Sequence, residues 1–176
     1  TIAYSPLITW CICLSLLCLL THKISRPIRI FLSLIAITCA SIAFASRIYF
    51  HEPSDDFIRY FGTFLRIYNK DYQVLFHYGS GLEIGLPSLY VLFAYLNPSK
   101  SPVIVLFLTI FSCSALYILW YEMFGNKILP ASMRSACIAL SLALFSYSYC
   151  TQTTRQMFSC VILLFAFSHH SYMKKI

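Results

Sequence analysis

Long stretches without a charged residue alternate with short polar links along this chain. Five of these stretches contain 17 to 21 residues, and they are residues 1–21, 30–46, 101–121, 135–154 and 156–173. A helix needs about 20 residues to cross the hydrocarbon core of a bilayer, with a range of about 17–25. Because backbone groups in hydrocarbon must satisfy each other's hydrogen bonds, we predict a transmembrane helix in each stretch. The predicted fold class is all-α, a polytopic bundle of transmembrane helices.

A sixth stretch, residues 84–99, is marginal. It has 16 residues, but Pro87 and Pro98 leave only about 11 strongly apolar ones. It can span the bilayer, or it can be re-entrant or lie in the interface. The choice sets the orientation of every later helix.

The basic residues favour one of these arrangements. The link at 22–29 has three positive charges and no acid, so the positive-inside rule places it in the cytoplasm and residues 47–83 outside. If residues 84–99 span, the final Lys174 and Lys175 lie outside, against the rule. In the other arrangement, which we prefer, the cytoplasmic side gains Lys127, Arg134, Lys174 and Lys175, and Arg155 lies on the outer face.

Most of the polar chemistry lies in residues 47–83, which contain five of the six carboxylates. We predict that this extracytoplasmic loop contains an amphipathic helix at about 54–69, where Ser54 can cap the helix and the next two acids suit its dipole. Its apolar face recurs at helical period and consists of Phe57, Tyr60, Phe61, Phe64, Leu65 and Tyr68. Its opposite face consists of Asp55, Arg59, Gly62 and Arg66.

The composition supports a membrane protein and narrows its chemistry. Apolar residues make up 59% of the chain and charged residues 11%, against about 45–50% and 25% in soluble domains. The net charge of +7 is spread over the links without a basic stripe, so we expect no binding of nucleic acid. The eight cysteines contain no Cys-x-x-Cys pair, and no Gly-rich phosphate loop is present. We therefore expect no metal and no cofactor.

Arginines and acids of the predicted amphipathic helix are the first candidate site. Arg59 and Arg66 lie two turns apart on one face, about 10 Å, which suits the grip of guanidinium groups on a pyrophosphate or sugar phosphate. The alternative is a solvated pair of Asp55 with Arg59. Asp55 and Asp56 can supply a general base or orient a sugar hydroxyl, or they can serve only the helix terminus.

Two further candidates lie next to apolar stretches. Glu83 precedes Gly85 at the point where the chain re-enters the membrane, and a carboxylate there needs a partner or water. Arg155 and Gln156 open the last long stretch after a polar, uncharged link. A functional role for Arg155 competes with simple snorkelling to the interface.

The order of these residues resembles a known family. Arg47 follows a basic link and a spanning helix, and the pattern continues with Asp56-x-x-x-Tyr60-x-x-x-Phe64, Glu83-x-Gly85 and Arg155-Gln156. This pattern resembles the bacterial polysaccharide polymerases of the EpsG and Wzy (O-antigen polymerase) type. The resemblance covers about residues 30–170, and we expect residues 1–176 to form a single membrane domain within a longer polytopic chain.

The resemblance implies a multi-pass glycosyltransferase of the bacterial inner membrane, active at its outer face in lipopolysaccharide or other polysaccharide biosynthesis. It implies transfer of a glycan from a polyprenyl-pyrophosphate donor to a lipid-linked repeat unit, with a chain-length regulator or a flippase as possible partners. The residues carried over as catalytic are Asp56, Glu83 and Arg155. Those carried over as substrate-binding are Arg47, Asp55, Arg59, Tyr60, Arg66 and Gln156.

Two other functions stay open at this point. One is a transporter or flippase for lipid-linked sugars, and the other is an accessory membrane subunit without catalysis. The polar residues gather on one side of the predicted membrane and the long stretches have uncharged centres. A transporter more often has charges and broken helices near the bilayer midplane, so this distribution favours the polymerase.

Overall fold

A computed structural model describes residues 4–20, 24–46, 56–77, 85–147, 150 and 153–173. Every regular element in this part of the chain is a helix, which confirms the all-α class. The elements are α1 (Tyr4–Leu19), α2 (Arg26–Ala45), α3 (Phe57–Tyr68), α4 (Val74–His77), α5 (Gly85–Leu96), α6 (Pro102–Trp120), the π-helical turn η2 (Tyr121–Gly125), α7 (Asn126–Ile128), α8 (Arg134–Leu144) and α10 (Thr154–Met173).

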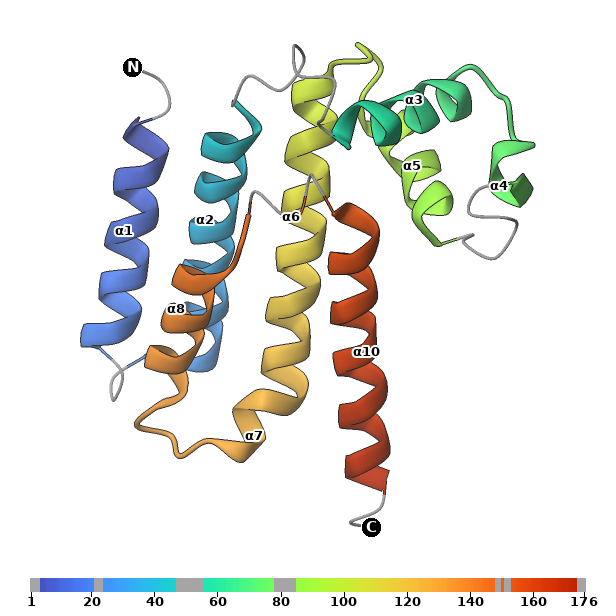
Figure 1. The fold of residues 1–176 in the computed structure, drawn as a ribbon. Helices are drawn as coiled ribbons and strands as arrows, with labels where there is room; N and C mark the ends of the chain where they lie inside the picture. Colours follow the sequence, from blue (N-terminus) through green and yellow to red (C-terminus); the bar gives the residue numbers. More distant parts are fainter. Residues whose placement is uncertain are drawn as a thin grey trace.

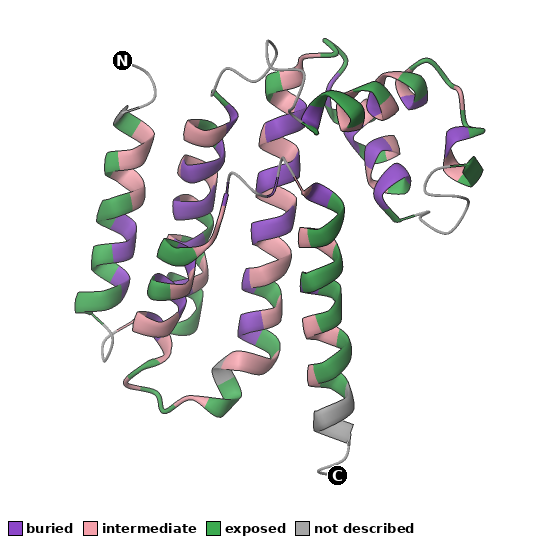
Figure 2. Cartoon of the chain, viewed as in Figure 1, coloured by how far each residue is buried: buried purple, intermediate pink, exposed green. Residues whose placement is uncertain are grey.

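The long helices form an up-and-down bundle around α6 (Figure 1). Helix α2 packs between α1 and α6, α8 packs on α1, and α10 packs on α6. Figure 2 shows buried residues along α2 and α6, whereas most of α10 is exposed. One core cluster of the bundle joins α1, α2, α6 and α8 through small and branched residues such as Ala36, Ile37, Ile118 and Leu142.

Two of the helices have both the length and the hydropathy of a membrane span, Arg26–Ala45 and Pro102–Gly125. Helices α1, α5 and α8 are apolar but shorter, with 16, 12 and 11 residues. The prediction of five full-length spans is therefore not confirmed, although two of the described helices are both long and apolar enough to cross a bilayer.

The stretch at 135–154 was predicted as one helix, and this is wrong. Helix α8 ends at Leu144, and Phe145 is extended. The Tyr147 hydroxyl donates to the carbonyl of Leu142 at 3.0 Å and closes the end of the helix. Ser, Tyr and Thr residues make this stretch uncharged without making it apolar, and hydroxyl groups compete for backbone hydrogen bonds. A lack of charge is a weaker signal than a high content of apolar residues.

Helix α3 covers residues 57–68, inside the predicted range of 54–69, and lies across one end of α5. Its buried residues are Phe57, Phe64 and Ile67. Tyr60, Phe61, Leu65 and Tyr68 are partly buried against the same cluster, which also contains Tyr90 and Phe93 of α5. Compared with the predicted apolar face, the buried face of α3 is rotated by part of a turn so that it includes Ile67. The reason is that α5 packs on that side of the helix.

Helix α5 reaches only part of the way through the bundle (Figure 1). Its 12 residues extend about 18 Å, well short of a 30 Å hydrocarbon core. The start of α2 and the end of α6 consequently lie at one end of the bundle, and α3 and the start of α10 lie toward the other. This relative placement agrees with the preferred arrangement of residues 84–99, while the side that faces the cytoplasm stays a prediction.

Candidate functional site

A cavity of about 680 Å³ lies between α5, α6 and α10. Its apolar wall is formed by Leu86 and Leu89 of α5, Leu116 of α6, and Phe158 and Ile162 of α10. The wall exists because α5 is short and α10 packs mainly on α6, which leaves space beside the first turns of α10. An apolar chain fits this wall.

Two of the predicted site residues, Arg155 and Gln156, line the same cavity. They occupy the first turn of α10, directly after Thr154, whose hydroxyl donates to the carbonyl of Cys150 at 2.7 Å. Both side chains are exposed, and Gly85 adds an open position at the start of α5. The cavity therefore combines an apolar wall with a cationic and hydrogen-bonding rim, which suits an amphipathic anion.

The acids and arginines of α3 form exposed ion pairs. The Asp56 carboxylate lies 3.7 Å from the Arg59 guanidinium, while the alternative partner Asp55 lies outside the described residues. Arg66 donates through Nε and Nη2 to one oxygen of Asp71, both at 2.9 Å. Asp56 stands at the start of α3 but its side chain makes no capping hydrogen bond. Arg59 and Arg66 therefore have separate carboxylate partners.

The remaining predicted residues divide into two groups. Tyr60 is partly buried and packs against the cluster between α3 and α5. Arg47, Asp55 and Glu83 lie outside the described residues. None of the described α3 residues lines the cavity with Arg155, so Arg155 and Gln156 are the predicted pair that the structure brings together.

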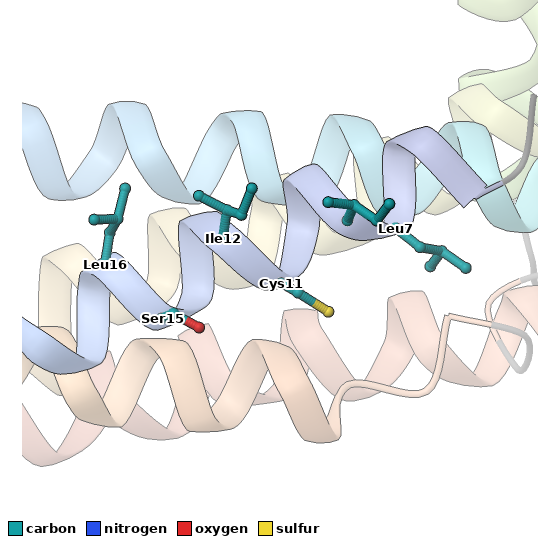
Figure 3. A pocket seen from close by; sticks show the side chains of 6 residues that line it. Leu7, Cys11, Ile12, Ser15 and Leu16 are labelled. Atoms are coloured by element: carbon teal, nitrogen blue, oxygen red, sulfur yellow. The ribbon is translucent and has the colours of Figure 1, made fainter.

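Figure 3 shows a second hollow of about 400 Å³, on the surface of α1. All of its lining residues come from this one helix, and Cys11 and Ser15 are the polar ones among them. It has no charged residue and carries no candidate chemistry. Within the part of the chain that the structure describes, no group of three or more His, Cys, Asp or Glu side chains can hold a metal.

An ion pair that sequence reasoning missed joins α2 to the end of α6. Glu122 accepts from Arg29 Nε at 2.7 Å and from Arg29 Nη2 at 2.9 Å. Only 6% of the Arg29 side chain and 4% of the Glu122 side chain are exposed. Arg26, which is 63% exposed, adds a third contact at 3.3 Å. One buried carboxylate thus holds two arginines.

The π-helical turn carries Glu122 into the bundle. Turn η2 continues α6 to Gly125, so Glu122 lies in the same continuous helical segment, Pro102–Gly125, which is long and apolar enough to cross a membrane. The Tyr121 hydroxyl donates to the carbonyl of Arg134 at 2.5 Å and fixes the start of α8 beside it. A single carboxylate at the end of a long apolar stretch was the available sequence signal, because such a group needs a partner.

Comparisons with protein-family models, with curated proteins and with solved structures find no match to this chain. The resemblance to polysaccharide polymerases therefore rests on a sparse pattern of residues. The cavity beside Arg155, the exposed ion pairs of α3 and the buried Arg29–Glu122 pair are the structural features from which a function must be argued.

Proposed function

We propose that this chain is a membrane-embedded polysaccharide polymerase that transfers a glycan from a polyprenyl-pyrophosphate donor to a lipid-linked repeat unit. The observation that carries the proposal is the cavity between α5, α6 and α10, where Arg155 and Gln156 border an apolar wall. Such a donor has an apolar tail and an anionic head, and this combination matches the two parts of the cavity. The bacterial inner membrane is the corresponding location.

In this proposal the polyprenyl chain lies along Leu86, Leu89 and Phe158, and the pyrophosphate lies at Arg155. The bond between the anomeric carbon and the pyrophosphate oxygen breaks as an acceptor hydroxyl forms the new glycosidic bond. The guanidinium of Arg155 stabilises the negative charge on the leaving pyrophosphate. The donor brings its own activation, so the reaction needs no nucleotide.

A carboxylate must accept the proton of the attacking hydroxyl. Asp56 and Glu83 are the candidates, and Glu83 stands two residues before Gly85 of the cavity. The exposed pairs of Asp56 with Arg59 and of Arg66 with Asp71 are each worth about 0.2–1 kcal/mol. Sugar hydroxyls or phosphates can replace these partners at little cost, which is consistent with substrate-binding roles for Arg59 and Arg66.

A transporter for lipid-linked sugars is the second candidate, and the buried Arg29–Glu122 pair favours it. Charged groups and broken helical geometry inside a span often mark a transport path. Here the pair closes on itself and lies at the last turn of the span, with a π-helical turn in place of a break. The polymerase explains the cavity as well as the α3 residues, and for this reason we place it first.

The test is reconstitution of the full chain in vesicles with lipid-linked repeat units, followed by analysis of glycan ladders. We expect Arg155→Ala and Arg155→Lys to lower the rate of ladder formation by about 30- to 1000-fold, because lysine keeps the charge but loses the planar fork. Lys127→Ala, at the opposite end of the bundle, is the matched control and should leave the rate unchanged.

Each other outcome of this experiment has a distinct meaning. Movement of the lipid-linked unit between leaflets without longer glycans identifies a flippase. Neither movement nor longer glycans indicates an accessory subunit. Full activity of both Arg155 variants, at normal membrane levels, overturns the role of Arg155 and leaves interfacial anchoring.

A further inference from the structure

We propose that a groove between α3 and α5 binds the saccharide portion of a substrate, an inference that rests on the proposed function. The groove has a volume of about 390 Å³. Three tyrosines line it, Tyr68 from the end of α3, Tyr72 from the following loop and Tyr95 from the end of α5. Lys70 is the charged residue among those that line it.

One of the three tyrosines, Tyr68, is held in place by its neighbours. Tyr68 donates its hydroxyl to the carbonyl of Pro98 at 3.0 Å, and the Lys100 ammonium lies 4.5 Å from the centre of its ring. Tyr72 and Tyr95 are 47% and 79% exposed. Exposed aromatic rings with hydrogen-bonding groups nearby are the surface on which the C–H faces of sugars stack, because each ring offers an apolar face and a polar edge.

Lys70 occupies a backbone position that favours glycine. Lys70 has a φ of 67°, in the left-handed region. Its N–H donates to the carbonyl of Ile67 at 2.9 Å, and the Asp71 N–H donates to that of Arg66 at 3.0 Å. This is the Schellman ending of a helix, in which the left-handed position is usually glycine. A lysine at this position places a long cationic side chain at the groove at the expense of an uncommon conformation.

The charges around the groove suit hydroxyl-rich or acidic sugars. Lys70 can donate up to three hydrogen bonds. The nearest acid in sequence, Asp71, is occupied by Arg66. Sugar hydroxyls and carboxylates can accept hydrogen bonds from the Lys70 ammonium. The ring faces of Tyr72 and Tyr95 can stack on the same sugar, because these residues line the same groove.

The position of the groove separates it from the cavity that takes the lipid. Helix α5 contributes Leu86 and Leu89 to the cavity and Val91, Ala94 and Tyr95 to the groove. At 100° per residue these two sets lie on opposite faces of α5, and Leu89 and Tyr95 are about 9 Å apart along its axis. The groove therefore suits a glycan that is held separately from the lipid and pyrophosphate in the cavity.

The experiment uses the full chain in nanodiscs and the free oligosaccharide that mild acid releases from lipid-linked repeat units of the host. Saturation-transfer NMR and a titration measure binding without any catalytic step. We expect about tenfold weaker binding for Tyr95→Ala and for Lys70→Gly, a typical effect for a central contact of a binding site. Lys70→Gly keeps or improves the backbone fit, so loss of binding cannot be attributed to misfolding.

Two further variants sharpen the result. Tyr95→Phe keeps the ring and should retain binding, and Phe76→Ala removes an exposed aromatic outside the groove and should have no effect. Unchanged binding in both Tyr95→Ala and Lys70→Gly, or no binding by the wild type, overturns the groove. Loss of membrane insertion without loss of binding would reveal an interfacial anchor instead and would also overturn it.

Failure of the groove and failure of the polymerase give different results. Ladder formation that persists in Tyr95→Ala and Lys70→Gly, together with unchanged oligosaccharide binding, rejects the groove and keeps the polymerase. Oligosaccharide binding by a wild type that forms no ladders rejects the polymerase and keeps the groove.

Discussion

At the scale of single residues, the Arg29–Glu122 contact is a buried, doubly hydrogen-bonded ion pair. It has two hydrogen bonds of 2.7 and 2.9 Å, and both side chains are almost fully buried. Removing two charges from water costs several kcal/mol per ion, and only close geometry with further hydrogen bonds offsets this cost. The pair therefore fixes how α2 meets α6, and it adds little stability compared with an apolar replacement.

Removal of one partner should be much more damaging than removal of both. We expect Glu122→Gln to lower the free energy of unfolding by about 3–5 kcal/mol, because Arg29 stays buried without a counter-charge. Thermal unfolding of the purified protein in detergent measures the effect. The double variant Arg29→Met with Glu122→Leu should recover most of the loss.

Arg26→Gln is the matched control for this series. Arg26 touches the same carboxylate, but its side chain is 63% exposed. An exposed partner contributes about 0–1 kcal/mol, so this variant should unfold close to the wild-type temperature. If Arg26→Gln and Glu122→Gln lowered the free energy of unfolding equally, burial would not determine the energy of these ion pairs.

These residues show what the sequence could and could not predict. Arg155 and Gln156 were identified because polar groups at the start of an apolar stretch are conspicuous. Arg29 was interpreted only as a topological charge of the link at 22–29, and no role was predicted for Glu122. Their pairing joins positions 93 residues apart, and no local pattern reports such a contact.

At the scale of elements, α3 follows its sequence pattern closely. Its apolar positions recur at helical period, and Phe57 and Phe64 are buried as predicted. The partner of Arg66 was not foreseen, because Asp71 follows the helix and is brought back by the left-handed turn at Lys70. Helical period predicts which face is buried, whereas the loop that ends the helix decides the ion pairs.

Gly62 tests whether α3 must stay helical. A Cβ added there meets nothing within 4 Å, and the position is exposed in the middle of the helix. We expect Gly62→Ala to stabilise the protein by about 0.5–1 kcal/mol, since glycine is the less favourable helix residue. Gly62→Pro should cost about 3 kcal/mol or more and abolish ladder formation, because proline removes a helical hydrogen bond and clashes with the preceding turn.

Thermal unfolding and glycan ladders, measured on the same two variants, separate structure from function. Wild-type stability and ladder length in Gly62→Pro would contradict a functional helix at 57–68. A destabilised Gly62→Ala variant would contradict the open position of this residue.

The last long stretches show where a hydropathy pattern becomes insufficient. Helix α10 continues for 20 residues, while α8 stops after 11. Both stretches lack acids and are similar in length. Trp120 explains part of the difference, since its indole N–H donates to the carbonyl of Leu164 and to the Ser168 hydroxyl, at 3.1 and 2.9 Å, and so attaches α10 to α6. Tertiary contacts of this kind decide the lengths of helices that composition leaves undetermined.

At the scale of the whole molecule, the two ends of the bundle differ in chemistry. One end contains the cluster of Arg26, Arg29 and Glu122 with Arg134 beside it. The other contains α3, the groove with its tyrosines, and the start of α10 with Arg155. The positive-inside rule applies to the link at 22–29, which has three positive charges and no acid, so α3 at the opposite end is predicted to face the outside.

The orientation can be measured by cysteine labelling in a variant that lacks the eight natural cysteines. Lys127→Cys and Phe76→Cys place thiols at exposed positions toward opposite ends of the bundle. We expect an impermeant maleimide to label Phe76→Cys in intact cells, and to label Lys127→Cys only after permeabilisation. Ladder formation by each variant verifies that the fold is kept. The reverse labelling would invert the membrane orientation and place both Arg155 and the groove in the cytoplasm, where the proposed reaction at the outer face could not occur.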